Sequence, residues 1–257
     1  MIIEEKNKNI TDSILYAKRI QTAILPSDDL INEKIKNYFI YYKPKDIVSG
    51  DFYFFAPSGD KTIFAVADCT GHGVPGAFMS MIGNSLLNQI IKEKGICCPG
   101  EILDKLHEEV RHSLKQEGGE TFDGMDIAIC SIDFAAKKLE YAGANRSLIV
   151  ISGNELKEIP ANKFPIGGVL TSKHKGFTNN IVDLKTNDTI YMSTDGFADQ
   201  FGGPEGKKFQ TRRFKELLQS VSSKAMAGQK TELENTMNEW MKNAEQLDDI
   251  LVAGIKI

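Results

Sequence analysis

Aspartates in this sequence stand where apolar runs typical of β-strands begin or end. Asp51 opens one such run, Asp68 and Asp195 each follow one, and Asp248 and Asp249 directly precede the last. A glycine close to three of these four places leaves room for a ligand to approach. Converging carboxylates repel one another unless a cation lies among them. Because oxygen ligands without histidine or thiolate suit Mg²⁺ or Mn²⁺ better than Zn²⁺, the pattern indicates a magnesium or manganese site.

A single aspartate at a strand end is usually a turn residue or a helix N-cap, and Asp188 fits that description. Only the four places taken together favour a metal site. The glycine-rich stretch 68–77 then leads from a predicted strand into a predicted helix, and such turns commonly expose backbone N–H groups to anions. Within it, His72 could serve as a general acid or as a hydrogen-bonding residue.

Runs of β-branched and aromatic residues bounded by Gly, Pro, Ser or Asp predict the strands that carry these aspartates. The predicted strands cover residues 38–42, 51–56, 62–67, 127–134, 138–142, 148–152, part of 181–193, and 250–257, with a hairpin suggested at Gly153-Asn154. Helical periodicity predicts helices over 76–93, from 99 to about 114, and twice between 214 and 244, with a mobile loop over 202–208. Strands in runs with grouped helices indicate an α+β fold.

Residues 2–25 form a charged segment with helical periodicity that ends at Pro26. Its apolar stripe consists of Ile3, Ile10, Ile14, Ala17, Ile20 and Ile24. Such a helix could lie on its own domain, or it could pair with a second copy as a short coiled coil. The segment holds at most three heptads, so the sequence leaves both interpretations open.

The chain has 257 residues, 41% hydrophobic and 26% charged, which is typical of a globular protein with one main domain and excludes wholesale disorder. A net charge of −4 argues against a nucleic-acid surface. Four cysteines without Cys-x-x-Cys spacing argue against a disulfide framework or a zinc site and favour a cytoplasmic protein. No membrane span and no signal peptide are predicted.

Six motifs in order resemble the metal-dependent protein serine/threonine phosphatases (protein phosphatase 2C, or PPM type), within them the bacterial branch of the stage II sporulation protein E. The motifs are Ser49-Gly-Asp-Phe-Tyr, Asp68-Cys-Thr-Gly-His-Gly-Val-Pro-Gly-Ala, Asp123-Gly-Met-Asp-Ile-Ala, Ala142-Gly-Ala-Asn, Ser193-Thr-Asp-Gly and Gln246-Leu-Asp-Asp-Ile. Together they cover about residues 38–257. The resemblance implies a four-layer α-β-β-α sandwich of two mostly antiparallel sheets flanked by helices.

The same resemblance implies two Mn²⁺ or Mg²⁺ ions bridged by water. Carried over, Asp68 would bridge both ions, the backbone carbonyl of Cys69 would bind one, and Asp195 and Asp248 would hold the other. Asp51 would act directly or through water, and Asp249 is a weaker candidate ligand than Asp248. Asp51, Asp68, Asp195 and Asp248 are thus the expected catalytic residues. Lys43 and Lys45 are candidates for the phosphate-gripping role of an arginine found in eukaryotic members.

The expected reaction is hydrolysis of phosphoserine or phosphothreonine on a partner protein, by resemblance an anti-sigma-factor antagonist. Residues 1–30 would form a linker or signalling helix, which could mediate a homodimer, and residues 31–257 the phosphatase domain. One alternative is a catalytically weak PPM-like module that only binds or dimerises. A two-metal nuclease is a second alternative, which the acidic net charge disfavours.

Overall fold

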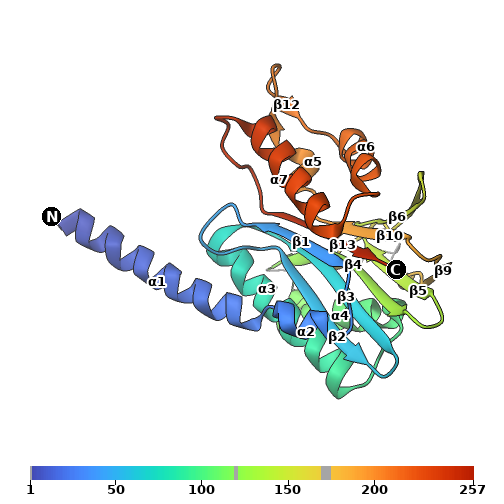
Figure 1. Cartoon of the computed structure of the whole chain (residues 1–257). Coiled ribbons are helices and arrows are strands. Elements are labelled where there is room, and N and C mark those ends of the chain that lie inside the picture. The colour runs from blue at the N-terminus through green and yellow to red at the C-terminus, as the bar shows by residue number, and fades with distance from the viewer. Residues whose placement is uncertain (1, 119–120, 169–174) are drawn as a thin grey trace.

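Two antiparallel sheets stacked on each other form the centre of the computed structural model, which describes residues 2–118, 121–168 and 175–257 (Figure 1). The first sheet has the order β1 (Tyr38–Lys43), β13 (Ile250–Lys256), β10 (Thr189–Ser193), β6 (Leu148–Ser152) and β7 (Glu155–Ile159). The second has the order β2 (Phe52–Ser58), β3 (Lys61–Cys69), β4 (Gly124–Asp133), β5 (Lys138–Ala144) and β9 (Asn180–Asp183), with β8 (Ile166–Gly167) paired to β4.

Alternating side chains of the central strands fill two different layers of the core. In β3, Phe64 and Val66 pack between the two sheets, whereas Ile63 and Ala65 pack against helices on the outer face. Successive side chains of a strand point to opposite faces, so a strand buried on both sides reads as a continuous apolar run. This explains why the sequence predicts β3 so clearly.

Helices cover the outer face of each sheet (Figure 1). On the second sheet lie α3 (Gly73–Asn88), continued by a π-helical turn (Gln89–Glu93), and α4 (Pro99–Ser113), followed by a 3₁₀ turn (Gln116–Gly118). On the first sheet lie α5 (Gly196–Asp199), α6 (Thr211–Val221) and α7 (Met226–Met241). The expected four-layer α-β-β-α sandwich is thereby confirmed.

Several short elements were not predicted from the sequence. The helix α2 (Asp28–Asn32) begins at Ser27, whose Oγ accepts a hydrogen bond from the backbone N–H of Leu30 at 3.3 Å. The strand β7 is mostly exposed and lacks a long apolar run, so its pairing with β6 across the Gly153-Asn154 turn defines it. Residues 202–208, expected as a loop, include part of a small hairpin of β11 (Phe201–Gly202) and β12 (Lys207–Lys208).

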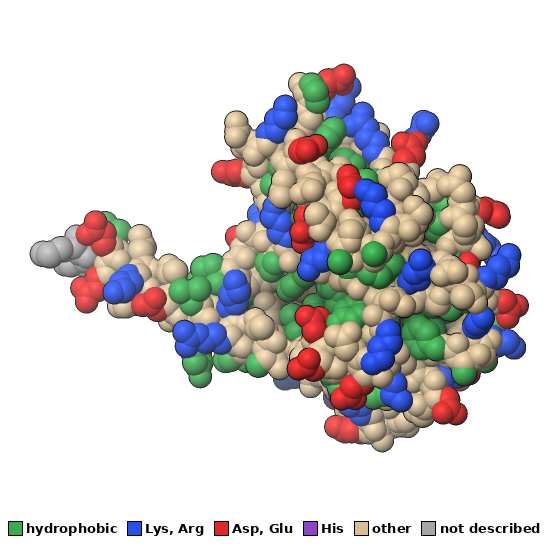
Figure 2. All heavy atoms as spheres, viewed as in Figure 1, with side chains coloured by type: hydrophobic (Ala, Val, Ile, Leu, Met, Phe, Trp, Pro, Cys, Tyr) green, Lys and Arg blue, Asp and Glu red, His purple; other side chains and the backbone are tan. Residues whose placement is uncertain are grey.

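The helix α1 (Ile2–Ile24) ends before Pro26 as predicted, and it projects away from the rest of the molecule (Figures 1 and 2). Ile3, Ile10 and Ile20 are 74%, 59% and 42% exposed. The interpretation that the apolar stripe lies on its own domain is therefore wrong for this part of the helix. None of the helices in the described ranges is both long and apolar enough to span a membrane.

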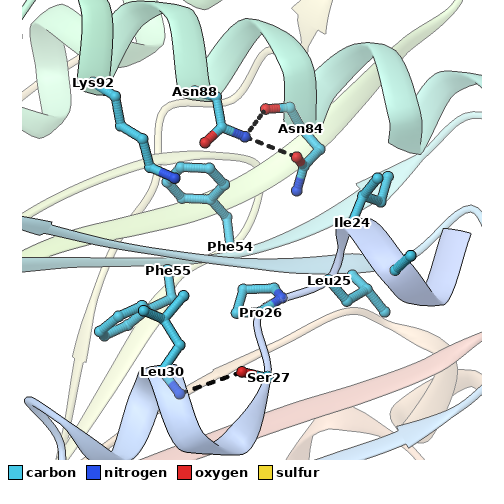
Figure 3. Close-up of a pocket in the computed structure, with 11 residues that line it drawn as sticks. Ile24, Leu25, Pro26, Ser27, Leu30, Phe54, Phe55, Asn84, Asn88 and Lys92 are labelled. Carbon is cyan, nitrogen blue, oxygen red and sulfur yellow. Dashed lines mark hydrogen bonds between the residues drawn. The ribbon is translucent and has the colours of Figure 1, made fainter.

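The C-terminal end of α1 joins the domain beside a cavity of about 310 Å³ (Figure 3). Phe54 and Phe55 point to opposite faces of β2 there, Phe54 toward α3 and Phe55 toward α2. The Nδ2 of Asn88 donates to both the backbone oxygen and the Oδ1 of Asn84 at 2.9 Å. The joint between α1 and the domain is thus partly polar and incompletely filled.

Candidate metal centre

The strand-end aspartates converge on one edge of the sandwich. Asp51 directly precedes β2, Asp68 is the second-last residue of β3, Asp195 follows β10 by two residues, and Asp248 precedes β13 by two. Because β2 pairs with β3 and β10 with β13, both antiparallel, these strand ends meet. Electrostatic interaction links Asp68 with Asp51, Asp195 and Asp248. The structure thus brings these four aspartates to the same edge of the sandwich, and their role as metal ligands stays a prediction.

The Asp51 carboxylate is buried, and one of its two oxygens lacks a hydrogen-bond donor. Asp51 is 2% exposed, and its Oδ2 has no hydrogen-bond partner among the residues that the structure describes. Burial, and next the charge of Asp68, raises the pKa of Asp51 well above its usual range, although the hydroxyl of Thr194 acts in the opposite direction. A buried carboxylate oxygen without a donor is suited to a cation.

Neighbouring charges act on the other carboxylates as well. Burial, with Asp195, Asp248 and Asp126, raises the pKa of Asp68 to about 8, against the lowering effect of Arg146. Burial and Asp195 also raise the pKa of Asp248. A divalent cation would stabilise the charged forms of these groups, and an all-oxygen set suits Mg²⁺ or Mn²⁺. The chemistry of the donor set therefore fits the ions that the sequence predicts.

Arg146 is a cation in direct contact with this cluster. Its Nη2 lies 2.7 Å from the Oδ2 of Asp68, 2.7 Å from the Oδ2 of Asp195 and 3.2 Å from the Oδ2 of Asp126. Asp126 faces Asp68 across the β3–β4 pair, and its Oδ1 accepts a hydrogen bond from Asn145 at 2.8 Å. In the described part of the chain, no three acidic, histidine or cysteine side chains are arranged to hold a metal ion.

Sequence reasoning missed Arg146 and Asp126. Both lie in or beside motifs that carry the family resemblance, Asp126 within residues 123–128 and Arg146 just after 142–145. Their position in those motifs was the available signal. Their interaction depends on the β5–β6 turn lying over the ends of β3 and β10, which local spacing does not reveal.

Asp249 differs from its neighbour Asp248. Its Oδ1 accepts the backbone N–H of Lys45 at 2.7 Å, and its Oδ2 accepts that of Gly50 at 2.8 Å. Both carboxylate oxygens are thus used to fix the segment that leads to Asp51. This arrangement favours Asp248 over Asp249 as a metal ligand.

The turn that follows β3 requires close backbone approach. A Cβ on Gly76 would collide with the carbonyl oxygen of Gly71 and lie 2.8 Å from the Cα of Gly50. Only glycine fits this position without displacing backbone.

The side chain of Cys69 packs in the core beneath α3, where burial raises the pKa of its thiol well above the usual range. The thiol is therefore unsuited to a metal, and the expected role of Cys69 rests on its backbone carbonyl.

His72 links two loops at the rim of the centre. Its Nδ1 lies 2.7 Å from the Oδ2 of Asp46, and its Nε2 lies 3.1 Å from the Nζ of Lys45. Because the ammonium of Lys45 can only donate, Nε2 accepts and Nδ1–H donates to Asp46. The structure thus shows His72 as a hydrogen-bonding residue. Lys43, the other lysine that is a candidate for binding phosphate, instead extends to Met241, and its Nζ lies 3.8 Å from the Sδ of that residue.

Residues 58–257 match the family described as Stage II sporulation protein E (SpoIIE). The chain belongs to this family. The SpoIIE match contains Asp68, Asp195 and Asp248, whereas Asp51 lies just before it. The family is of the PP2C type, which is metal-dependent and uses Mn²⁺ or Mg²⁺.

Solved structures agree with the SpoIIE assignment. The SiaA-PP2C domain of Pseudomonas aeruginosa is 34% identical, with a TM-score of 0.89 over 98% of each chain. The PP2C phosphatase domain with a regulatory fragment of SpoIIE from Bacillus subtilis is 18% identical, with a TM-score of 0.68 over 86% of this chain and 62% of that one. RsbX in complex with magnesium is 16% identical, with a TM-score of 0.57 over 86% and 94%. The last two show a shared fold.

Proposed function

We propose that the chain is an active Mn²⁺- or Mg²⁺-dependent phosphatase that hydrolyses phosphoserine or phosphothreonine on a partner protein. Two ions would be held by the carboxylates of Asp51, Asp68, Asp195 and Asp248, with the backbone carbonyl of Cys69. The observation that carries the proposal is the meeting of four strand-end carboxylates, among them the buried Asp51, whose Oδ2 has no hydrogen-bond partner in the described part of the chain.

Bound divalent ions would neutralise the charge of the phosphoryl group and generate a nucleophile from water near neutral pH. The protein's own residues would fix the ligands and meet the substrate. Asp249 and Thr194 hold the two segments that carry Asp51 and Asp248, since Thr194 exchanges hydrogen bonds with the backbone of Leu251. Lys45, whose charge reaches Asp248, is better placed than Lys43 to bind a phosphoryl oxygen.

The substrate class is carried over from the family. By resemblance the partner is an anti-sigma-factor antagonist, and a cytoplasmic location follows from the cysteine usage. The acidic centre, with Arg146 and Lys45 as its nearby cations, offers little to a polyanionic nucleic acid and supports the preference for a phosphoprotein over a nuclease substrate.

The proposed division of the chain places a linker helix at residues 1–30 and the phosphatase domain at 31–257. In support, Ile31 is fully buried between the two sheets, whereas most of α1 is exposed. We propose that α1 pairs with α1 of a second copy. Ile3, Ile10 and Ala17 recur every seven residues, and Ile3 and Ile10 are largely exposed.

The test is hydrolysis of p-nitrophenyl phosphate and of a phosphoserine peptide, with Mn²⁺ and with EDTA. Turnover should require Mn²⁺, and Asp195→Asn should reduce it at least about 100-fold, since outer-shell changes alone cost roughly 10–100-fold. Asp60→Asn is the matched control, because Asp60 is an exposed residue in the β2–β3 turn, at the opposite end of β3 from Asp68. Metal-independent turnover, or an Asp195→Asn variant as active as Asp60→Asn, would contradict the assignment.

The alternative of a catalytically weak binding module makes a different prediction. Such a protein would turn over neither substrate and would not bind Mn²⁺ in a calorimetric titration. A resting phosphatase that awaits a regulator would bind Mn²⁺ without turnover. Calorimetry on the same samples therefore separates these two outcomes.

A further inference from the structure

Arg146 contacts the proposed metal ligands through a single nitrogen atom. The Nη2 lies 2.7 Å from an oxygen of Asp68, in β3 of the second sheet, and 2.7 Å from an oxygen of Asp195, which follows β10 of the first sheet. The side chains of Arg146 and Asp68 are 15% and 18% exposed, so their contact is largely shielded from solvent, whereas the Asp195 side chain is 41% exposed. One guanidinium thus joins the two halves of the sandwich at the point where the ions are proposed to bind.

The backbone of Arg146 is held by its neighbours, whereas the carboxylate contacts of its side chain run through the Nη2 end of the guanidinium. Asn145 adopts a left-handed conformation, with φ of 56°, and its amide bonds to Asp126. The backbone oxygen of Arg146 accepts a hydrogen bond from the hydroxyl of Tyr141. In contrast, the Nε of Arg146 has no hydrogen-bond partner among the described residues. Contact through one nitrogen lacks the geometric constraint of a paired, bidentate guanidinium–carboxylate bond.

A cavity of about 280 Å³ adjoins the guanidinium. It is bordered by Arg146, Asp195 and Asp199, and by Ser147, Thr211 and Lys215. The Ser147 and Thr211 hydroxyls line this cavity, and its charged residues Asp199 and Lys215 are paired with Lys208 and Glu158. The cavity therefore offers the side chain of Arg146 space beside the centre, with hydroxyl groups to receive it.

We propose that Arg146 is a resident counter-cation of the metal-free centre, which divalent ions must displace before they can bind Asp68 and Asp195. This inference rests on the proposed metal site. The guanidinium occupies the Oδ2 of Asp68 and the Oδ2 of Asp195, and a positive guanidinium beside divalent cations is repelled. Displaced, it would turn into the adjoining cavity. The apparent affinity for metal would thus be set partly by this residue.

The experiment is calorimetric titration of Mn²⁺ into the full chain and its Arg146→Ala variant, with melting temperatures measured in EDTA. Removing the competitor should tighten Mn²⁺ binding at least about tenfold, equivalent to roughly 1.4 kcal/mol. In EDTA the variant should melt at a lower temperature, because three carboxylates lose their counter-charge. Arg212→Ala, which removes an exposed arginine paired with Glu216, should change neither value.

A merely structural arginine would also lower the melting temperature, but its loss would not tighten Mn²⁺ binding. Equal or weaker binding by Arg146→Ala would therefore overturn the inference and leave the proposed function intact. Should the alanine variant not fold, Arg146→Gln keeps the bulk without the charge, and the same comparison applies. If neither the parent nor any variant binds Mn²⁺, the proposed function fails, and this inference fails with it.

Discussion

Two adjacent aspartates, Asp248 and Asp249, show how the centre divides its tasks between residues. Asp249 is 2% exposed, and both of its oxygens accept backbone N–H groups. Asp248 accepts the backbone N–H of Asp249 at 2.8 Å, and burial together with the charge of Asp195 raises the pKa of Asp248. The pair thus combines a structural carboxylate with one available to a metal.

Substitution of Asp249 should therefore mainly lower stability, whereas substitution of Asp248 should mainly weaken metal binding. Asp249→Ala should lower the free energy of unfolding by roughly 2–4 kcal/mol, because two backbone amides lose their acceptor. Asp248→Asn should leave the free energy of unfolding in EDTA nearly unchanged while weakening Mn²⁺ binding at least about tenfold. Urea denaturation and calorimetry measure the two effects. The opposite pattern, with Asp249→Ala stable and Asp248→Asn unfolded, would refute the division.

At the scale of single residues, the sequence predicts the acidic residues of the centre but not Arg146, a cation that contacts them. Asp51, Asp68, Asp195 and Asp248 are recognisable because each stands at the end of an apolar run, which is a local signal. Arg146 follows a predicted strand too, yet a single arginine after a strand is unremarkable. Its role arises from contacts with residues 78 and 49 positions away in the chain.

At the scale of elements, Gln21 connects α1 to the segment that carries Asp51. Its Nε2 donates to the backbone oxygen of Ser49 at 2.6 Å and to the Oγ of Ser80 at 2.9 Å, and its Oε1 accepts the backbone N–H of Ser49 at 3.1 Å. The Oγ of Ser49 in turn accepts the backbone N–H of Asp51 at 3.0 Å. A change in the position of α1 would therefore be transmitted to Asp51 through Gln21 and Ser49.

Loss of this connection should affect stability and activity together. Gln21→Leu should lower the free energy of unfolding by about 1–3 kcal/mol, because buried polar groups of Ser49 and Ser80 lose their partner. It should also lower kcat, because the segment that places Asp51 is freed. Thr22→Ala, an exposed neighbour on the same helix, is the control. A Gln21→Leu variant that keeps the full kcat despite reduced stability would show that the connection is only structural.

Elements with a continuous apolar run were predicted well, and elements defined by their neighbours were not. The strands β3, β4 and β13 are buried on both faces, which produces a strong local pattern. By contrast, β7 and β8 exist because a neighbouring strand pairs with them, and β8 is two residues long. Their existence depends on contacts that the local sequence does not encode.

At the scale of the whole molecule, the exposed apolar stripe of α1 is the feature that a single copy leaves unexplained. Figure 2 shows apolar side chains along the projecting helix, among charged ones. Leaving Ile3, Ile10 and Ile20 partly in water forgoes some of the stabilisation that burial provides, which is roughly 1.5–3 kcal/mol for a side chain that passes from fully exposed to fully buried. A second α1 would bury them in both copies at once.

Pairing through α1 should therefore double the mass in solution from 28.5 kDa. The double variant Ile3→Glu/Ile10→Glu should be monomeric by light scattering, because four charges would meet at the seam. Asn9→Glu is the control, since it adds charge beside the stripe without replacing an apolar residue. Because Gln21 lies on the same helix, loss of pairing should also change Mn²⁺-dependent turnover. A parent protein that is monomeric at tens of micromolar, or a double variant that keeps the dimer mass, would refute pairing through this stripe.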